Sequence, residues 1–132
     1  MVVYGGATGG KHFLLTRTGG SLASDDLYLL DMRQGETSAN WMIVPIVGKT
    51  PGRRYGHTIV FVKPFLIAFG GNTGSEAVGD VWCLSVDKAP FSWVRLETGG
   101  DSPPVRVYHG AAICSTGTAT GMMVLFGGRT AD

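Results

Sequence analysis

The chain has 132 residues, of which 44% are hydrophobic and 10% aromatic, so it has enough apolar material for a folded core and a disordered chain is excluded. Eleven Lys and Arg residues against ten Asp and Glu leave a net charge of +1. This balance excludes a strongly basic protein that binds nucleic acid or an anionic membrane through its overall charge.

Glycine is over-represented, at 21 residues, and only 16% of the chain is charged. This composition predicts many tight turns between apolar strands. The two cysteines, Cys83 and Cys114, are too few for a disulfide framework and favour a reducing compartment. We therefore expect a cytoplasmic or nuclear protein, with neither a secretory leader nor a membrane span.

The first predicted strand, Val2–Tyr4, ends in the diglycine Gly5-Gly6. After a long segment, the strand around Tyr28 follows Asp26, and another strand follows around Trp41. All three runs are short, apolar or aromatic, and bounded by Gly, Asp or Asn, as strands are. No helical period of useful length interrupts them.

The middle of the chain repeats these features and adds a strand before the diglycine. The predicted strands cover residues 57–61, 65–69, 80–84 and 93–96. The last third contains the beginning of another repeat. Four pairs of identical residues are separated by 52 positions: Trp41 and Trp93, Pro51 and Pro103, Arg54 and Arg106, His57 and His109. A repeat of about fifty residues with four antiparallel strands is typical of a propeller blade.

The motifs of this repeat recur in a fixed order. A diglycine is followed by Asp-x-Tyr or Asp-x-Trp, by Trp, and then by Pro-x-x-Arg-x-x-His. In this order they resemble the kelch repeat over essentially the whole chain. The amino-acid sequence around Gly70-Gly71-Asn72, Trp93–Glu97 and Phe126–Arg129 is similar to that of the kelch region of kelch-containing Ser/Thr protein phosphatases of plants and protists.

The resemblance implies an all-β, kelch-type β-propeller fragment of about two and a half four-stranded antiparallel blades. Residues 1–47 form an incomplete blade that lacks its first strand, and residues 53–97 form a complete blade. Residues 105–132 supply the first two strands of a third blade. Because kelch propellers have about six blades, we expect the missing blades of a longer parent protein to be partners of this chain.

Residues that recur in every repeat are predicted to hold the blades together, since a catalytic pair need occur only once. The glycine pairs permit positive φ and close contact between blades. Each Asp orders a turn through backbone amides, and the aromatic residues pack between blades. These structural residues are Gly5, Gly6, Asp26, Tyr28, Trp41, Arg54, His57, Gly70, Gly71, Asp80, Trp82, Trp93, Arg106, His109, Gly127 and Gly128.

Catalytic chemistry finds little support in the sequence. Gly79-Asp80-Val81 resembles the opening of a metallophosphatase motif, but Trp82 stands where a histidine is required. The three histidines do not have the spacing of a zinc site, and no Gly-x-Ser-x-Gly is present. We expect no catalytic residue, no metal site and no cofactor in this chain. A parent phosphatase domain, if present, would bind two divalent metals.

The long connections are predicted to lie on one face of the propeller and to bind a partner. They carry the basic residues Lys11, Arg17, Lys49 and Arg53. Solvated loops are normally polar, so any one of these basic residues is weak evidence for a binding site. As a group, they suit an acidic or phosphorylated peptide. We do not expect nucleic acid or membrane as a partner.

The sequence therefore predicts a kelch-repeat protein-interaction module, the regulatory or targeting part of a larger Ser/Thr phosphoprotein phosphatase. The alternative is a non-enzymatic kelch substrate adaptor or a cytoskeletal scaffold. Phosphatase motifs elsewhere in the parent protein would favour the first function, and an oligomerisation or adaptor domain the second.

Overall fold

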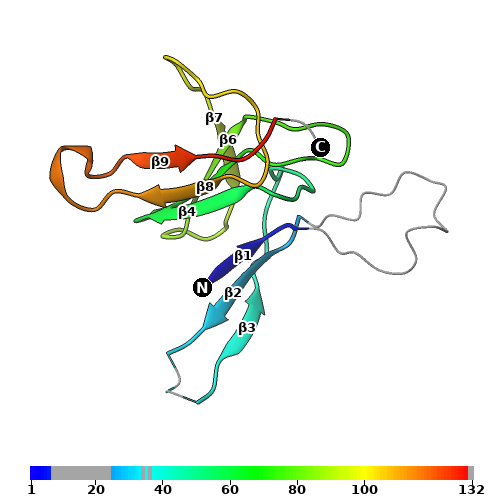
Figure 1. The fold of residues 1–132 in the computed structure, drawn as a ribbon. Helices are drawn as coiled ribbons and strands as arrows, with labels where there is room; N and C mark the ends of the chain where they lie inside the picture. The colour runs from blue at the N-terminus through cyan, green and yellow to red at the C-terminus, as the bar shows by residue number, and fades with distance from the viewer. Residues whose placement is uncertain (7–24, 34, 36, 131–132) are drawn as a thin grey trace, which may run out of the picture.

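The computed structural model describes residues 1–6, 25–33, 35 and 37–130. Within them the chain forms three antiparallel sheets that follow one another along the sequence (Figure 1). The first contains β1 (Val2–Tyr4), β2 (Leu27–Asp31) and β3 (Asn40–Ile43). The second contains β4 (Thr58–Val62), β5 (Phe65–Phe69), β6 (Val81–Ser85) and β7 (Trp93–Leu96). The third contains β8 (Gly110–Ile113) and β9 (Met123–Phe126).

Strands adjacent in sequence are paired in every sheet, so each sheet is a meander. The described residues form no α-helix, and their only helical element is one 3-10 turn, η2 (Gly117–Ala119). The predictions for residues 65–69 and 93–96 match β5 and β7, whereas β4 and β6 begin and end one residue later than predicted. The predicted all-β, antiparallel fold is confirmed.

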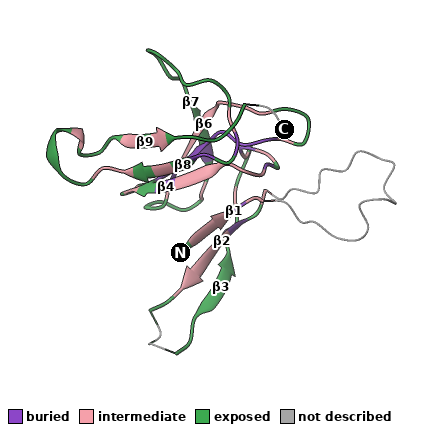
Figure 2. Ribbon diagram, viewed as in Figure 1, coloured by how far each residue is buried: buried purple, intermediate pink, exposed green. Residues whose placement is uncertain are grey.

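The main core lies between the first and second sheets (Figure 2). Tyr4 and Leu27 of the first sheet are 3% and 1% exposed, and Leu66 and Leu84 of the second are 2% and 1% exposed. Outer strand β3 is exposed along its whole length, whereas every strand of the second sheet except β7 has at least one buried residue in its interior. Burial is therefore greatest where two sheets meet, as repeat architectures require.

The same hydrogen bonds join each sheet to the next. The Gly6 amide donates to the Arg54 carbonyl at 2.8 Å, and the Gly71 amide donates to the Arg106 carbonyl at 2.9 Å. In the chain the donors follow β1 and β5, and the acceptors precede β4 and β8. The third sheet thus joins the second as the second joins the first, and β4 and β8 lie side by side (Figure 1).

The second glycine of the Gly70-Gly71 pair lies where no side chain fits. Gly71 has φ +95°, and a Cβ there would lie 2.8 Å from the Cβ of His57 and 2.9 Å from the Tyr55 carbonyl oxygen. Gly70, with φ +70°, would place a Cβ 2.9 Å from the imidazole of His109 in the following sheet. The pair therefore lets two sheets approach each other closely.

Candidate functional site

Arg54 is the most buried of the charged side chains that recur in the repeat. Only 2% of the residue is exposed. Its Nη1 donates to Asp80 Oδ1 at 2.8 Å and to the Gly70 carbonyl at 2.9 Å, and its guanidinium also bonds to the Pro51 carbonyl. One side chain thus ties together the connection before β4, the end of β5 and the beginning of β6.

Asp80 accepts bonds from two side chains. Besides Arg54 it accepts from Trp82 Nε1 at 2.7 Å. Burial alone raises the pKa of this carboxyl, but the hydrogen bonds from Arg54 and Trp82 and the charge of Arg54 outweigh burial and lower the pKa. Asp80 is therefore an ionised partner of a buried arginine.

His57 joins the second sheet to the first. Its Nε2 lies 2.6 Å from the Tyr4 carbonyl oxygen, which can only accept, so Nε2 carries the proton. Nδ1 is buried and has no hydrogen-bond partner among the described residues. Burial lowers the pKa of His57, and burial likewise lowers that of His109, whose Nε2 lies 2.7 Å from Thr58 Oγ1. Both imidazoles are therefore expected to be neutral at pH 7.

We predict that acid destabilises the chain through these histidines. The unfolded pKa is about 6.5 and the folded pKa is lower, so the unfolded state binds more protons in this range. The stabilisation is complete above pH 6.5 and is lost as the pH falls toward the folded pKa, by at most about 1.4 kcal/mol per pH unit for each histidine. Urea midpoints measured from pH 7.5 to 5 should fall with pH. His57→Gln, which keeps an N–H donor but does not titrate, should flatten this dependence; an unchanged slope would contradict it.

The remaining motif residues lie beside these contacts. Arg106 donates to the Gly127 and Pro104 carbonyls at 3.0 and 3.2 Å. The amides of Gly5 and Gly70 each donate at 3.2 Å to the carbonyl of the Asp that follows in the repeat, Asp26 or Asp80. Gly128 has φ +85° and faces His109 as Gly71 faces His57. Tyr28 and Trp41 form an edge-to-face pair with ring centroids 6.4 Å apart.

Two of the four basic residues predicted to bind a partner can be placed. Lys49 and Arg53 are exposed on the connection that leads from the first sheet to β4. Lys11 and Arg17 lie outside the described residues.

Lys49 lines a cavity of about 610 Å³ together with Thr50, Trp82, Trp93 and Arg95. Trp93 and Arg95 point to the same face of β7, and Trp82 lies opposite Arg95 in the register. This cavity, which we call the Lys49 pocket, has two cations, two indoles and no carboxylate in its lining. This lining suits a ligand that carries an anionic group next to an apolar group.

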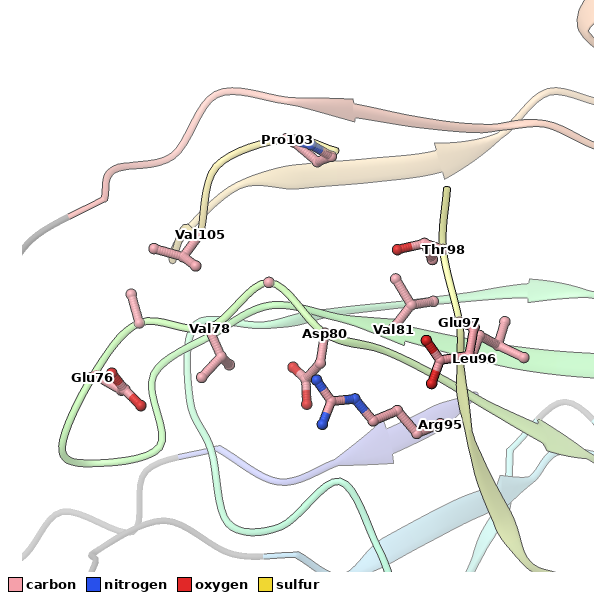
Figure 3. Close-up of a pocket in the computed structure, with 12 residues that line it drawn as sticks. Glu76, Val78, Asp80, Val81, Arg95, Leu96, Glu97, Thr98, Pro103 and Val105 are labelled. Carbon is pink, nitrogen blue, oxygen red and sulfur yellow. The ribbon is translucent and has the colours of Figure 1, made fainter. Parts of the chain in front are cut away.

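A second cavity, of about 640 Å³, lies between the connection into β6 and the connection that follows β7 (Figure 3). Glu76 and Glu97 lie at opposite sides of it, and Asp80 and Arg95 lie between them (Figure 3). Carboxylates outnumber cations in this lining, so an acidic partner suits it less than it suits the Lys49 pocket.

Sequence reasoning missed Arg95 as a candidate. The signal was available, since an alternating strand that places Trp93 on a face also places Arg95 there. This signal marks Arg95 as a candidate only once it is known that the connection carrying Lys49 lies next to β7. Among the described residues, no three His, Cys, Asp or Glu side chains are grouped closely enough to hold a metal ion. The described part of the chain also contains no helix of the length and apolarity needed to cross a membrane.

Three antiparallel sheets of three, four and two strands, joined by repeating contacts, make this chain part of a β-propeller. Residues 1–132 match the KLHDC2/KLHL20/DRC7 Kelch-repeats domain, and the chain belongs to this family. Kelch domains are protein-interaction modules and are not catalytic, so the predicted class of function is confirmed.

Several curated proteins are similar to the chain. Serine/threonine-protein phosphatase BSL2 of Arabidopsis thaliana is 38% identical over 84% of this chain and 10% of its own length. The leucine-zipper-like transcriptional regulator 1 homolog of Drosophila melanogaster is 39% identical over 59% of the chain and 8% of its own length. Host cell factor 1 of Homo sapiens is 32% identical over 79% of the chain and 5% of its own length. The chain thus spans a tenth or less of the length of each relative. The similarity to BSL2 confirms the predicted resemblance to kelch-containing phosphatases.

Proposed function

We propose that the chain is the regulatory or targeting part of a larger Ser/Thr protein phosphatase. The support is its 38% identity to BSL2 over most of its length. Because the chain spans only a tenth of that relative, hydrolysis would belong to a separate domain that binds two divalent metals. This chain would select the phosphoprotein and place it near that domain.

The second candidate is a kelch substrate adaptor or cytoskeletal scaffold without an attached enzyme. It is favoured by relatives whose names contain no phosphatase, the transcriptional regulator homolog and host cell factor 1. Sequencing the parent reading frame discriminates between the two. Gly-Asp-x-His-Gly and Gly-Asn-His-Glu motifs would establish the phosphatase, and an oligomerisation or adaptor domain would establish the alternative.

The partner, in this proposal, is an acidic or phosphorylated peptide that binds at the Lys49 pocket. The observation that carries the proposal is that Lys49 and Arg95 line one cavity together with Trp82 and Trp93. A phosphate or carboxylate would pair with the two cations, and the neighbouring apolar part of the peptide would pack on the Trp82 indole, since Trp93 is nearly buried. Arg53, exposed on the same connection, would add to the attraction.

We predict that the double change Lys49→Glu and Arg95→Glu weakens binding of a phosphoserine peptide by about tenfold or more, because it replaces two attractive charges with two repulsive ones. Isothermal titration measures the effect. Lys63→Glu with Lys88→Glu is the matched control, since both are exposed lysines in connections at the other end of the strands, between β4 and β5 and between β6 and β7. Equal losses for the two double variants would remove the case for a site at this pocket.

Further blades of the parent protein are proposed as a second kind of partner. Tyr4, Phe69 and Phe126 each precede a diglycine, and they are 3%, 4% and 83% exposed. Tyr4 packs on Trp93 and His57 of the next sheet, and Phe69 packs on His109 of the next. By the same geometry, Phe126 would be covered by the blade that comes after the third sheet.

We further infer that the recurring glycines, aspartates, arginines, histidines and tryptophans act as structural residues. Support comes from their contacts within and between sheets, described above. We also propose that the protein works in the cytoplasm or the nucleus, where its two free cysteines, Cys83 and Cys114, stay reduced.

A further inference from the structure

The Trp82 side chain is held in one orientation by a polar contact. Its indole Nε1 donates to Asp80 Oδ2 at 2.7 Å. This distance is shorter than the usual ~2.9 Å of an N–H···O bond, as expected when the acceptor is an ionised carboxylate. Asp80 comes directly before β6 and Trp82 lies within it, two positions later, so both side chains point to the same face of the second sheet. The bond therefore restricts rotation of the indole.

The carboxylate that accepts this bond is itself fixed in place. Arg54 donates to Asp80 Oδ1 at 2.8 Å and to Oδ2 at 3.1 Å, so both carboxylate oxygens are engaged. The same guanidinium donates to the Gly70 carbonyl at 2.9 Å, which anchors it to the backbone. Asp80 thus presents its acceptor to the Trp82 indole at a fixed position.

Trp82 lies in a row of side chains that crosses the second sheet. The register pairs it with Ala68 of β5 on one side and with Arg95 of β7 on the other. Ala68 is completely buried, whereas Arg95 is exposed, so the indole lies between the interior of the sheet and the cation at its rim. It also packs against the core cluster between the first two sheets.

Trp82 supplies the accessible aromatic surface of the Lys49 pocket. Trp93, the other tryptophan in the lining, is 5% exposed, whereas Trp82 is only partly buried. The described residues that line this pocket do not include Asp80, and Arg54 offsets its charge. Apart from its charge, Asp80 can therefore affect a ligand in the pocket only through the Trp82 indole.

We propose that Asp80 is a positioning residue of the Lys49 pocket, which holds the Trp82 indole so that its face receives the apolar side chain next to the anionic group of the peptide. An indole that is already fixed loses little conformational freedom when the peptide binds, so the contact contributes more to affinity. This inference rests on the proposed function, because it concerns the specificity of the same pocket. It gives the buried ion pair a role in recognition besides its role in stability.

The test is isothermal titration of the full chain with two synthetic peptides that differ only in the residue after phosphoserine, which is leucine in one and glycine in the other. The unmodified chain should bind the leucine peptide at least fivefold more tightly, because the leucine side chain packs on the indole. The ratio of the two Kd values is compared among variants, since a change of charge at position 80 affects both peptides alike. Binding of neither peptide would overturn the proposed function together with this inference. Binding without a preference for leucine would overturn this inference alone.

Two changes break the bond between Asp80 and Trp82 from opposite sides. Asp80→Asn removes the charged acceptor, and the preference for leucine should fall below twofold. Replacement of Trp82 by β-(3-benzothienyl)alanine keeps a bicyclic ring and removes only the N–H donor. It leaves Arg54 and Asp80 unchanged, so it tests the bond even if Asp80→Asn does not fold, and the preference should again fall below twofold. An unchanged preference in this second variant would overturn the proposal.

A combination and a control separate positioning from a merely structural role. Asp80→Asn added to the benzothienyl variant should lower the preference no further, because both changes break the same bond. Trp41→Phe is the control, since Trp41 is 55% exposed and lies outside the lining of the pocket, and it should keep the fivefold preference. A lower Tm with an unchanged preference in Asp80→Asn would assign Asp80 a structural role alone.

Discussion

Replacement of Arg54 by methionine is expected to destabilise the chain by about 3–5 kcal/mol, because it removes the cation from a buried ion pair and leaves the Asp80 carboxylate without a counter-ion. The side chains of Arg54 and Asp80 are 2% and 13% exposed, so water cannot replace the lost partner well. The Gly70 and Pro51 carbonyls lose their donors as well. Since small domains have only about 5–15 kcal/mol of total stability, much of the chain should unfold at 37 °C. Urea denaturation followed by circular dichroism measures the loss.

Arg106→Met is the matched control for this experiment. Arg106 holds the equivalent place in the next repeat, but its guanidinium bonds lie at the exposed surface. We expect its replacement to cost less than about 1.5 kcal/mol. The double variant Arg54→Met with Asp80→Leu should recover part of the stability, since it removes both buried charges together. A similar loss for Arg54→Met and Arg106→Met would show that burial of the pair does not matter.

Trp93→Ala is expected to be as damaging, at about 3–5 kcal/mol, because it leaves a cavity between two sheets. Trp93 is 5% exposed, belongs to the core cluster and packs on Tyr4 with ring centroids 5.3 Å apart. The truncation therefore weakens the boundary between the first and second sheets as well as the second sheet itself. Thermal and urea unfolding of the purified variant measure the effect.

Trp41 provides the comparison within the same molecule. It has the same place in the repeat but is 55% exposed in this chain, with Tyr28 as its aromatic neighbour. Trp41→Ala should cost about 1 kcal/mol, since little surface is uncovered. If both alanine variants lost the same stability, contact between successive sheets could not be what gives Trp93 its importance.

The fold could be predicted from the sequence because several independent signals agreed. Strand-length apolar runs, the diglycines and the 52-residue separation between Arg54 and Arg106 all indicated the same repeat. The predicted bounds of β4 and β6 were one residue too early, because a strand begins at the first residue that pairs with the neighbouring strand. Thr58, rather than His57, is the first residue of β4 that pairs with β5, at Phe69. His57 turns instead toward Tyr4 of the preceding sheet.

The candidate sites were only partly predictable, and for a physical reason. Lys49 could be predicted from its position on a long connection. That it lines the same cavity as Arg95 depends on how this connection lies against β7. That arrangement exists only once the chain has folded, and no single-strand pattern encodes it.

The hydrogen bonds from Gly6 to Arg54 and from Gly71 to Arg106 join main-chain groups alone. Exposed side chains of the connecting loops take no part in these bonds, so they can change without loosening the boundary between sheets. Residues such as Lys49 and Arg53 are free to vary with the partner, while the glycines stay. A blade can thus acquire a new binding partner by point substitution at exposed loop positions, while its main-chain contacts with the next sheet stay the same.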